Sequence, residues 1–145
     1  MKKAVILAGI AVLIILAILY ERQEQPEVCF HSKCFKVELA TTPEKQDRGL
    51  MYREKLDADA GMLFIFKDEG VYPFWMKNML IPLDILWLDD NKQVVYIIKN
   101  FQPCESDPCP SANLNVPARY VLELNAGTAD RAGIAVGDTA SFSLP

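Results

Sequence analysis

The chain has 145 residues, a formal net charge of −4 at neutral pH and four cysteines, which suffices for one ordinary domain and excludes a multidomain machine. Beyond residue 20 there are 13 basic and 19 acidic residues, and no run of Lys or Arg follows residue 3. Because phosphate contacts need a basic stripe, these counts argue against a nucleic-acid-binding protein.

The N-terminal segment predicts a membrane anchor. Lys2 and Lys3 precede an uninterrupted run of apolar residues and glycine at 4–20, and a polar linker follows at 21–27. A helix over 4–20 would be about 25 Å long, the lower limit for crossing the hydrocarbon core. Leu19 stands where a signal peptidase needs a small residue, which favours an uncleaved span. The positive-inside rule then places the N terminus in the cytoplasm and the rest of the chain outside the cell membrane.

The four cysteines form two pairs with the same spacing. Four residues separate Cys29 from Cys34, and four separate Cys104 from Cys109 in a stretch rich in proline. Three pairings are available, and an oxidising compartment favours disulfides, so we expect the two local pairs. A four-thiolate zinc site is the alternative, with His31 as a further candidate ligand, although its usual spacing fits this pattern only marginally.

Residues 28–145 predict an extracytoplasmic β-rich domain. Short segments that alternate apolar and polar residues, or are wholly apolar, recur between turn signals. Thr41 and Glu44 make a capping-box pattern around Pro43, which predicts a helix at 43–51. We expect a mainly β (α+β) fold, a compact, closed or nearly closed antiparallel structure with this one short helix, because a small sheet needs its edges covered. The expected strands are 35–40, 61–66, 74–79, 83–89, 93–101, 119–125 and 139–144, with a loop at 103–115 and a helical turn at 128–132.

The segment 74–88 carries three polar residues in an apolar setting. Twelve of its fifteen residues are apolar or proline, and the exceptions are Lys77, Asn78 and Asp84. Alternation places Asp84 on an apolar face, where a charge is costly unless it is paired. A structural ion pair or a turn aspartate would satisfy this requirement.

The functional alternative is a pocket floored by Trp75. Lys77 and Asp84 must pair with each other, face a polar cleft, or meet Arg48 or Arg53. In the functional interpretation, Lys77, Asn78 and Asp84 converge on this pocket. Such a pocket, with an aromatic wall and a few convergent polar groups, suits a small polar or anionic ligand.

Metal and enzyme chemistry are less well supported. Four methionines, Met51, Met62, Met76 and Met79, could offer thioethers to Cu(I), but the last two would point to opposite faces of a strand. No G-x-S-x-G pattern occurs and the chain has one histidine, which argues against a nucleophilic hydrolase. We therefore expect no metal, no cofactor and no assignable catalytic residue.

Several motifs together resemble one family. The motifs resemble the domain of unknown function 192 family over residues 35–145, and the resemblance implies a compact β-rich domain, often exported, with no established activity. It marks Arg48, Trp75, Lys77, Asn78 and Asp84 as the polar signature, and Met79 stands where the family usually has Thr. The motifs are Arg48-Gly49-Leu50-Met51, Gly61-Met62-Leu63-Phe64, Phe74-Trp75-Met76-Lys77-Asn78, Ile81-Pro82-Leu83-Asp84, Tyr120-Val121-Leu122-Glu123 and the segment 133–138.

These features predict a membrane-anchored module that binds a small polar ligand or an envelope protein partner. The alternative is a small envelope-associated enzyme that uses Asp84 and Lys77, and a protein that handles copper or zinc is less favoured. The candidate ligand-binding residues are Arg48, Arg53, Trp75, Lys77, Asn78 and Asp84.

Overall fold

The computed structural model describes residues 25–144 other than 106 and 113. The predicted anchor at 4–20 lies outside the described residues, so it stays a prediction. Within the described part of the chain, no helix combines the length and the apolar character that a membrane span requires.

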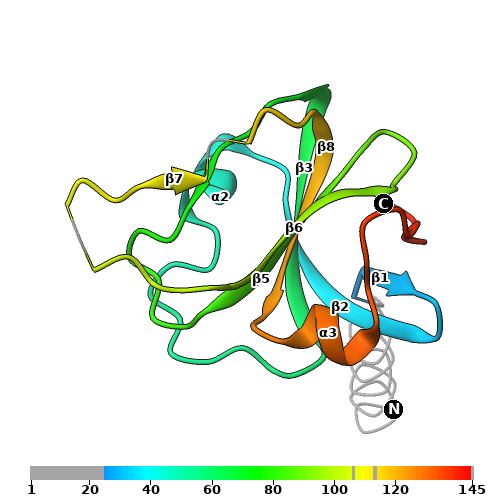
Figure 1. Cartoon of the computed structure of the whole chain (residues 1–145), viewed down its shortest axis with the longest axis horizontal. Coiled ribbons are helices and arrows are strands. Elements are labelled where there is room, and N and C mark those ends of the chain that lie inside the picture. The colour runs from blue at the N-terminus through cyan, green and yellow to red at the C-terminus, as the bar shows by residue number, and fades with distance from the viewer. Residues whose placement is uncertain (1–24, 106, 113, 145) are drawn as a thin grey trace, which may run out of the picture.

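The main element is a six-stranded mixed sheet with the strand order β1-β2-β3-β8-β5-β6, and β4 and β7 form a separate two-stranded sheet (Figure 1). β2 and β3 are parallel, and the other neighbours in the large sheet are antiparallel. The strands are β1 Glu27–Phe30, β2 Lys33–Ala40, β3 Ala60–Gly70, β4 Phe74–Trp75, β5 Leu83–Leu88, β6 Val94–Phe101, β7 Ser111–Ala112 and β8 Ala118–Asn125, and the helices are α2 Pro43–Arg48 and α3 Thr128–Ala132.

The fold is mainly β, as predicted, but the expectation of a closed or nearly closed antiparallel structure is wrong. The connection at 41–59 carries the chain back to the end of the sheet where β2 began, so β3 pairs with β2 in parallel. The predicted strand 139–144 forms only isolated bridges, from Ser141 to Cys29 and from Thr139 to Gln93. The C-terminal segment therefore touches both edge strands, β1 at Cys29 and β6 at Val94, but it forms no continuous strand between them and the sheet stays open.

The helix α2 is shorter than predicted. Its N-cap is Thr42, whose hydroxyl accepts a hydrogen bond from the backbone N–H of Lys45, so the capping residue is one position later than expected. Gly49 ends the helix with φ 49°, a conformation that favours glycine. The side chain of Gln46 donates to the backbone carbonyls of Ala40 and Ile65 and so ties α2 to the sheet.

The predicted strand 74–79 is also shorter. Only Phe74–Trp75 pair as a strand, with Ser111–Ala112 from the predicted loop. Asn78 has φ 58°, which is incompatible with a strand and ends the extended segment in a turn. The hairpin β5-β6, the strand β8 and the helical turn α3 all form where they were predicted.

Two apolar cores lie on the two faces of the large sheet. Leu86 and Leu122 belong to the core on the α3 side, while Ile85, Trp87 and Val121 belong to the core on the α2 side. Figure 1 shows α2 and α3 on different sides of the sheet. Because every residue of β5 is buried, both faces of this strand lie in a core.

The predicted local disulfides are confirmed. Cys29 and Cys34 lie opposite each other in the β1-β2 hairpin with their Cα atoms 4.0 Å apart. Cys104 and Cys109 form the second disulfide, with a Cα separation of 5.8 Å. No thiolate remains for the alternative zinc site, because all four cysteines are paired.

Candidate functional site

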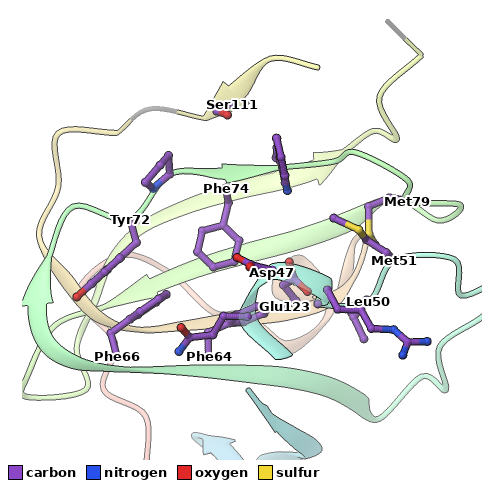
Figure 2. A pocket seen from close by; sticks show the side chains of 15 residues that line it. Asp47, Leu50, Met51, Phe64, Phe66, Tyr72, Phe74, Met79, Ser111 and Glu123 are labelled. Carbon is purple, nitrogen blue, oxygen red and sulfur yellow. The ribbon is translucent and has the colours of Figure 1, made fainter. Parts of the chain in front are cut away.

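A cavity of about 340 Å³ lies on the α2 side of the sheet, between α2, β3 and the segment that includes β4. Figure 2 shows it from close by, with side chains from these elements pointing into it. Apolar and aromatic groups form most of the lining, which includes a carboxyl group from β8. The lining residues are Gln46, Asp47, Arg48, Gly49, Leu50, Met51, Phe64, Phe66, Tyr72, Pro73, Phe74, Trp75, Met79, Ser111 and Glu123.

Aromatic rings make the walls of the cavity. Phe64 and Phe74 meet edge to face with ring centroids 4.9 Å apart, and Phe66 and Tyr72 stack at 3.6 Å (Figure 2). Trp75 is 45% exposed and belongs to the lining. These contacts fix the rings in place, so the walls are preformed.

Glu123 lies at the floor of the cavity. It belongs to β8, the strand between β3 and β5, where Met62 and Ile85 are its neighbours across the sheet. The side chain is buried, and its Oε2 atom has no hydrogen-bond partner among the described residues. Burial raises the pKa of Glu123 to about 8, and the positive charge of Arg53 opposes this rise in part. The carboxyl group is therefore mostly neutral at pH 7.

Gly49 lets the backbone approach the floor. A Cβ atom at this position would lie 3.2 Å from the ring of Phe64 and 3.7 Å from Oε2 of Glu123. The positive φ at Gly49 and this short approach both favour glycine. The end of α2 thus forms part of the cavity without a side chain filling it.

The two predicted arginines have different positions. Arg48 lines the cavity, and it also lines a neighbouring groove that contains Arg53. Arg53 donates to both carboxylate oxygens of Glu38, with an Nη2–Oε2 distance of 2.7 Å. This hydrogen bond lowers the pKa of Glu38 and raises that of Arg53. Arg53 is therefore already paired, whereas Arg48 is exposed at the cavity.

Lys77 and Asn78 do not converge on the floor of the cavity. Lys77 is exposed, with its Nζ atom 5.4 Å from the ring centroid of Trp75. Asn78 donates a weak bond to the sulfur of Met51, and its backbone carbonyl accepts from the N–H of Tyr52. Asn78 thus connects the turn after β4 to the chain after α2, while Lys77 lies over the ring of Trp75.

Asp84 lies on the opposite face of the sheet from Glu123 and is fully buried. Its carboxylate accepts three backbone hydrogen bonds, from Asn100 at 2.8 Å, Gly127 at 3.0 Å and Ala129 at 2.8 Å. The predicted pocket with Lys77 and Asp84 convergent is therefore wrong. Backbone N–H groups satisfy this buried charge, so its role is structural, but the partners are neither the ion pair nor the turn at 81–82 that we considered.

All four methionines considered above belong to or pack against the apolar core on the α2 side, where methionine is a common packing residue. Met51 and Met79 line the cavity, while Met62 and Met76 do not. Among the described residues, one group of three His, Cys or acidic side chains has metal-ligand spacing: Glu27, Cys29 and Cys34. Its two sulfurs form a disulfide, so they are not available as thiolates.

Sequence reasoning missed Glu123, although a signal was present. The residues from Tyr120 to Leu124 are apolar apart from this glutamate. The argument that singled out Asp84, a charged residue inside an otherwise apolar strand, applies equally to Glu123. Among the predicted candidates, Arg48 and Trp75 line the same cavity as this carboxyl group.

Comparison with known proteins identifies the family of this domain. Residues 27–142 match DUF192, described as "Uncharacterized ACR". The chain belongs to the DUF192 family. No curated protein matches its sequence significantly.

Two crystal structures of similar proteins share the fold. One comes from Sinorhizobium meliloti 1021 and is described as a candidate transcription regulator; it is 35% identical, with a TM-score of 0.74, over 81% of this chain and 92% of the other. The second, from Novosphingobium aromaticivorans DSM 12444, is described as a protein of unknown function. It is 34% identical, with a TM-score of 0.71, over 80% of this chain and 83% of the other.

Proposed function

We propose that this DUF192 protein is a binding module, anchored by residues 4–20 at the outer face of the cytoplasmic membrane, that holds a small ligand in the cavity between α2, β3 and β4. The observation that carries this proposal is Glu123. A buried carboxyl oxygen without a partner is costly, and its position at the floor of a cavity supplies a reason for it.

The size and lining of the cavity support a small ligand with an apolar part. A volume of about 340 Å³ is at the lower end of the range for small-molecule sites, and most of the lining is apolar. The carboxyl group of Glu123 then fixes the orientation of one polar group. An anionic ligand fits less well, since the polar group at the floor is itself an acid.

The alternatives have less geometric support. An enzyme that uses Asp84 and Lys77 would need these groups together, but Asp84 is enclosed by backbone N–H groups and Lys77 is exposed elsewhere. A raised pKa also suits a general base, which keeps Glu123 as the residue for a second candidate function, a small hydrolytic enzyme. One similar structure is described as a candidate transcription regulator; for this chain, a role of that kind through DNA contacts is disfavoured by the net charge of −4.

A ligand screen tests the proposal. Thermal unfolding of the purified full chain is measured against a library of small amphiphilic molecules, for the wild type and for Glu123→Leu, which removes the carboxyl group. The matched control is Glu54→Leu, because Glu54 is exposed and outside the cavity. Saturable stabilisation that Glu123→Leu abolishes, without conversion of the ligand, supports a binding module.

Two other results would contradict it. Conversion of a bound ligand to a product identifies an enzyme. Binding that is unchanged in Glu123→Leu, or no ligand at all, leaves the carboxyl group without a role in recognition.

A further inference from the structure

The charges around the cavity are unevenly distributed. Two acidic side chains line it, the buried Glu123 and the exposed Asp47, and both are labelled in Figure 2. Arg48 is the one cationic side chain in the lining, and it is exposed. The interior thus combines an acid at the floor with aromatic rings in the walls.

We propose that the cavity binds an alkylammonium cation, with its positive nitrogen beside Glu123 and its alkyl groups against the aromatic rings. This inference rests on the proposed function and names the chemical class of its ligand. The faces of aromatic rings carry negative charge density, and a ring within about 6 Å of a cation attracts it.

The unpartnered oxygen of Glu123 distinguishes a cation from other ligands. An anion would face the exposed Asp47 and would make the ionised form of Glu123 still less favourable. A neutral ligand would need a hydrogen-bond donor aimed at Oε2, whereas a cation stabilises the carboxylate without such a donor. An alkylated ammonium group also loses little hydration on entering an apolar cavity, because its charge is covered by carbon.

Binding of a cation should be coupled to loss of a proton. Burial keeps the carboxyl group of Glu123 protonated at neutral pH, with a pKa of about 8, and the cation requires its ionised form. The other titratable or charged side chains that face this region are Asp47 and Arg48 from α2, Tyr72 from the segment before β4, and Arg53, which is paired with Glu38 of β2. Affinity should therefore rise with pH and level off above the pKa of Glu123.

The test compares choline with 3,3-dimethylbutan-1-ol, its neutral analogue of the same shape. Binding to the full chain is measured by calorimetry. We expect choline to bind at least about tenfold more tightly than the alcohol. The aromatic rings and the ionised carboxyl group attract a cation, and they do not attract a neutral group of the same shape. Because choline does not titrate, a drop from about pH 8 to about pH 6 should weaken its binding on the order of 50-fold through Glu123 alone.

Two matched variants test whether Glu123 causes the pH dependence and the preference for choline. Glu123→Gln keeps the shape of the side chain but cannot ionise, so it should lose the pH dependence and most of the preference for choline. Glu54→Gln makes the same chemical change at an exposed position outside the cavity and should behave as the wild type does. Thermal unfolding of both variants checks that they are folded.

Equal binding of choline and its neutral analogue overturns the inference, and so does binding of choline that ignores pH or survives Glu123→Gln. If choline fails to bind at millimolar concentrations while the wider screen finds a neutral or anionic ligand that needs Glu123, the cation assignment is wrong and the proposed function stands. If neither choline nor any library compound binds, both are wrong.

Discussion

The carboxyl group of Glu123 should make the stability of the fold depend on pH. An ordinary glutamate in the unfolded chain has a pKa near 4.5, and in the folded protein burial raises that of Glu123 to about 8. Between these values the unfolded chain has released a proton that the folded protein still holds. The free energy of unfolding therefore falls as pH rises through this window and levels off above about pH 8.

The variant Glu123→Gln should remove this dependence. At about pH 4.5 it should be nearly as stable as the wild type, and above about pH 8 it should be more stable by up to about 5 kcal/mol. Urea denaturation at a series of pH values measures the difference. Glu54→Gln is the control, and a wild-type curve parallel to that of Glu123→Gln across the window would show that the carboxyl group is not held neutral.

Individual residues show where sequence reasoning works and where it ends. Burial of Asp84 follows from its place in an apolar strand, and the same logic would have found Glu123. The partners of Asp84 do not follow, because its three donors are backbone groups at 100, 127 and 129. A sequence shows that a buried charge needs partners, but backbone donors carry no residue-type signal.

At the level of elements, Asp84 holds three segments together. It belongs to β5, and its carboxylate accepts from β6, from the turn after β8 and from α3. Asp84→Asn replaces one acceptor oxygen with a donor that faces another N–H group. Because hydrogen bonds to a buried charge are strong, we expect a loss of about 2–4 kcal/mol in the free energy of unfolding.

Chemical denaturation measures this loss, and amide hydrogen exchange locates it. The protection of residues 127–133 should fall more than that of β2 or β3. Asp130→Asn is the control, because Asp130 is exposed and its ion pair with Lys99 lies at the surface, where such pairs contribute less than about 1 kcal/mol. An equal effect of the two substitutions would contradict the role given to Asp84.

The pattern of apolar and polar residues predicts some strands of this fold better than others. The hairpin β5-β6 and β8 were predicted from apolar runs between turn signals, and these features are local. The parallel pairing of β2 with β3 was missed, because it depends on the path of the chain at 41–59. The strand at 74–79 was overextended, since Asn78 takes a left-handed conformation that the apolar pattern does not encode.

For the whole molecule, the sequence predicts a fixed orientation in the cell membrane. A protease added to intact cells with permeabilised outer layers should digest residues 28–145 and leave the anchor at 4–20 in the membrane, because both early lysines favour a cytoplasmic N terminus. Immunoblotting of the fragments measures this. Digestion only after lysis would reverse the orientation, and a mature protein that begins after Tyr20 would show that the segment is cleaved.

The position of β8 also bears on the time at which the chain can fold. This strand lies between β3 and β5, although it is the last strand of the large sheet to be synthesised. Until residues 118–125 emerge, β3 and β5 each lack a neighbour and the two cores cannot form. Pairing between distant segments is slow compared with local pairing. We therefore expect a chain with this strand order to complete its large sheet only after residues 118–125 have emerged, which is compatible with export in an unfolded state.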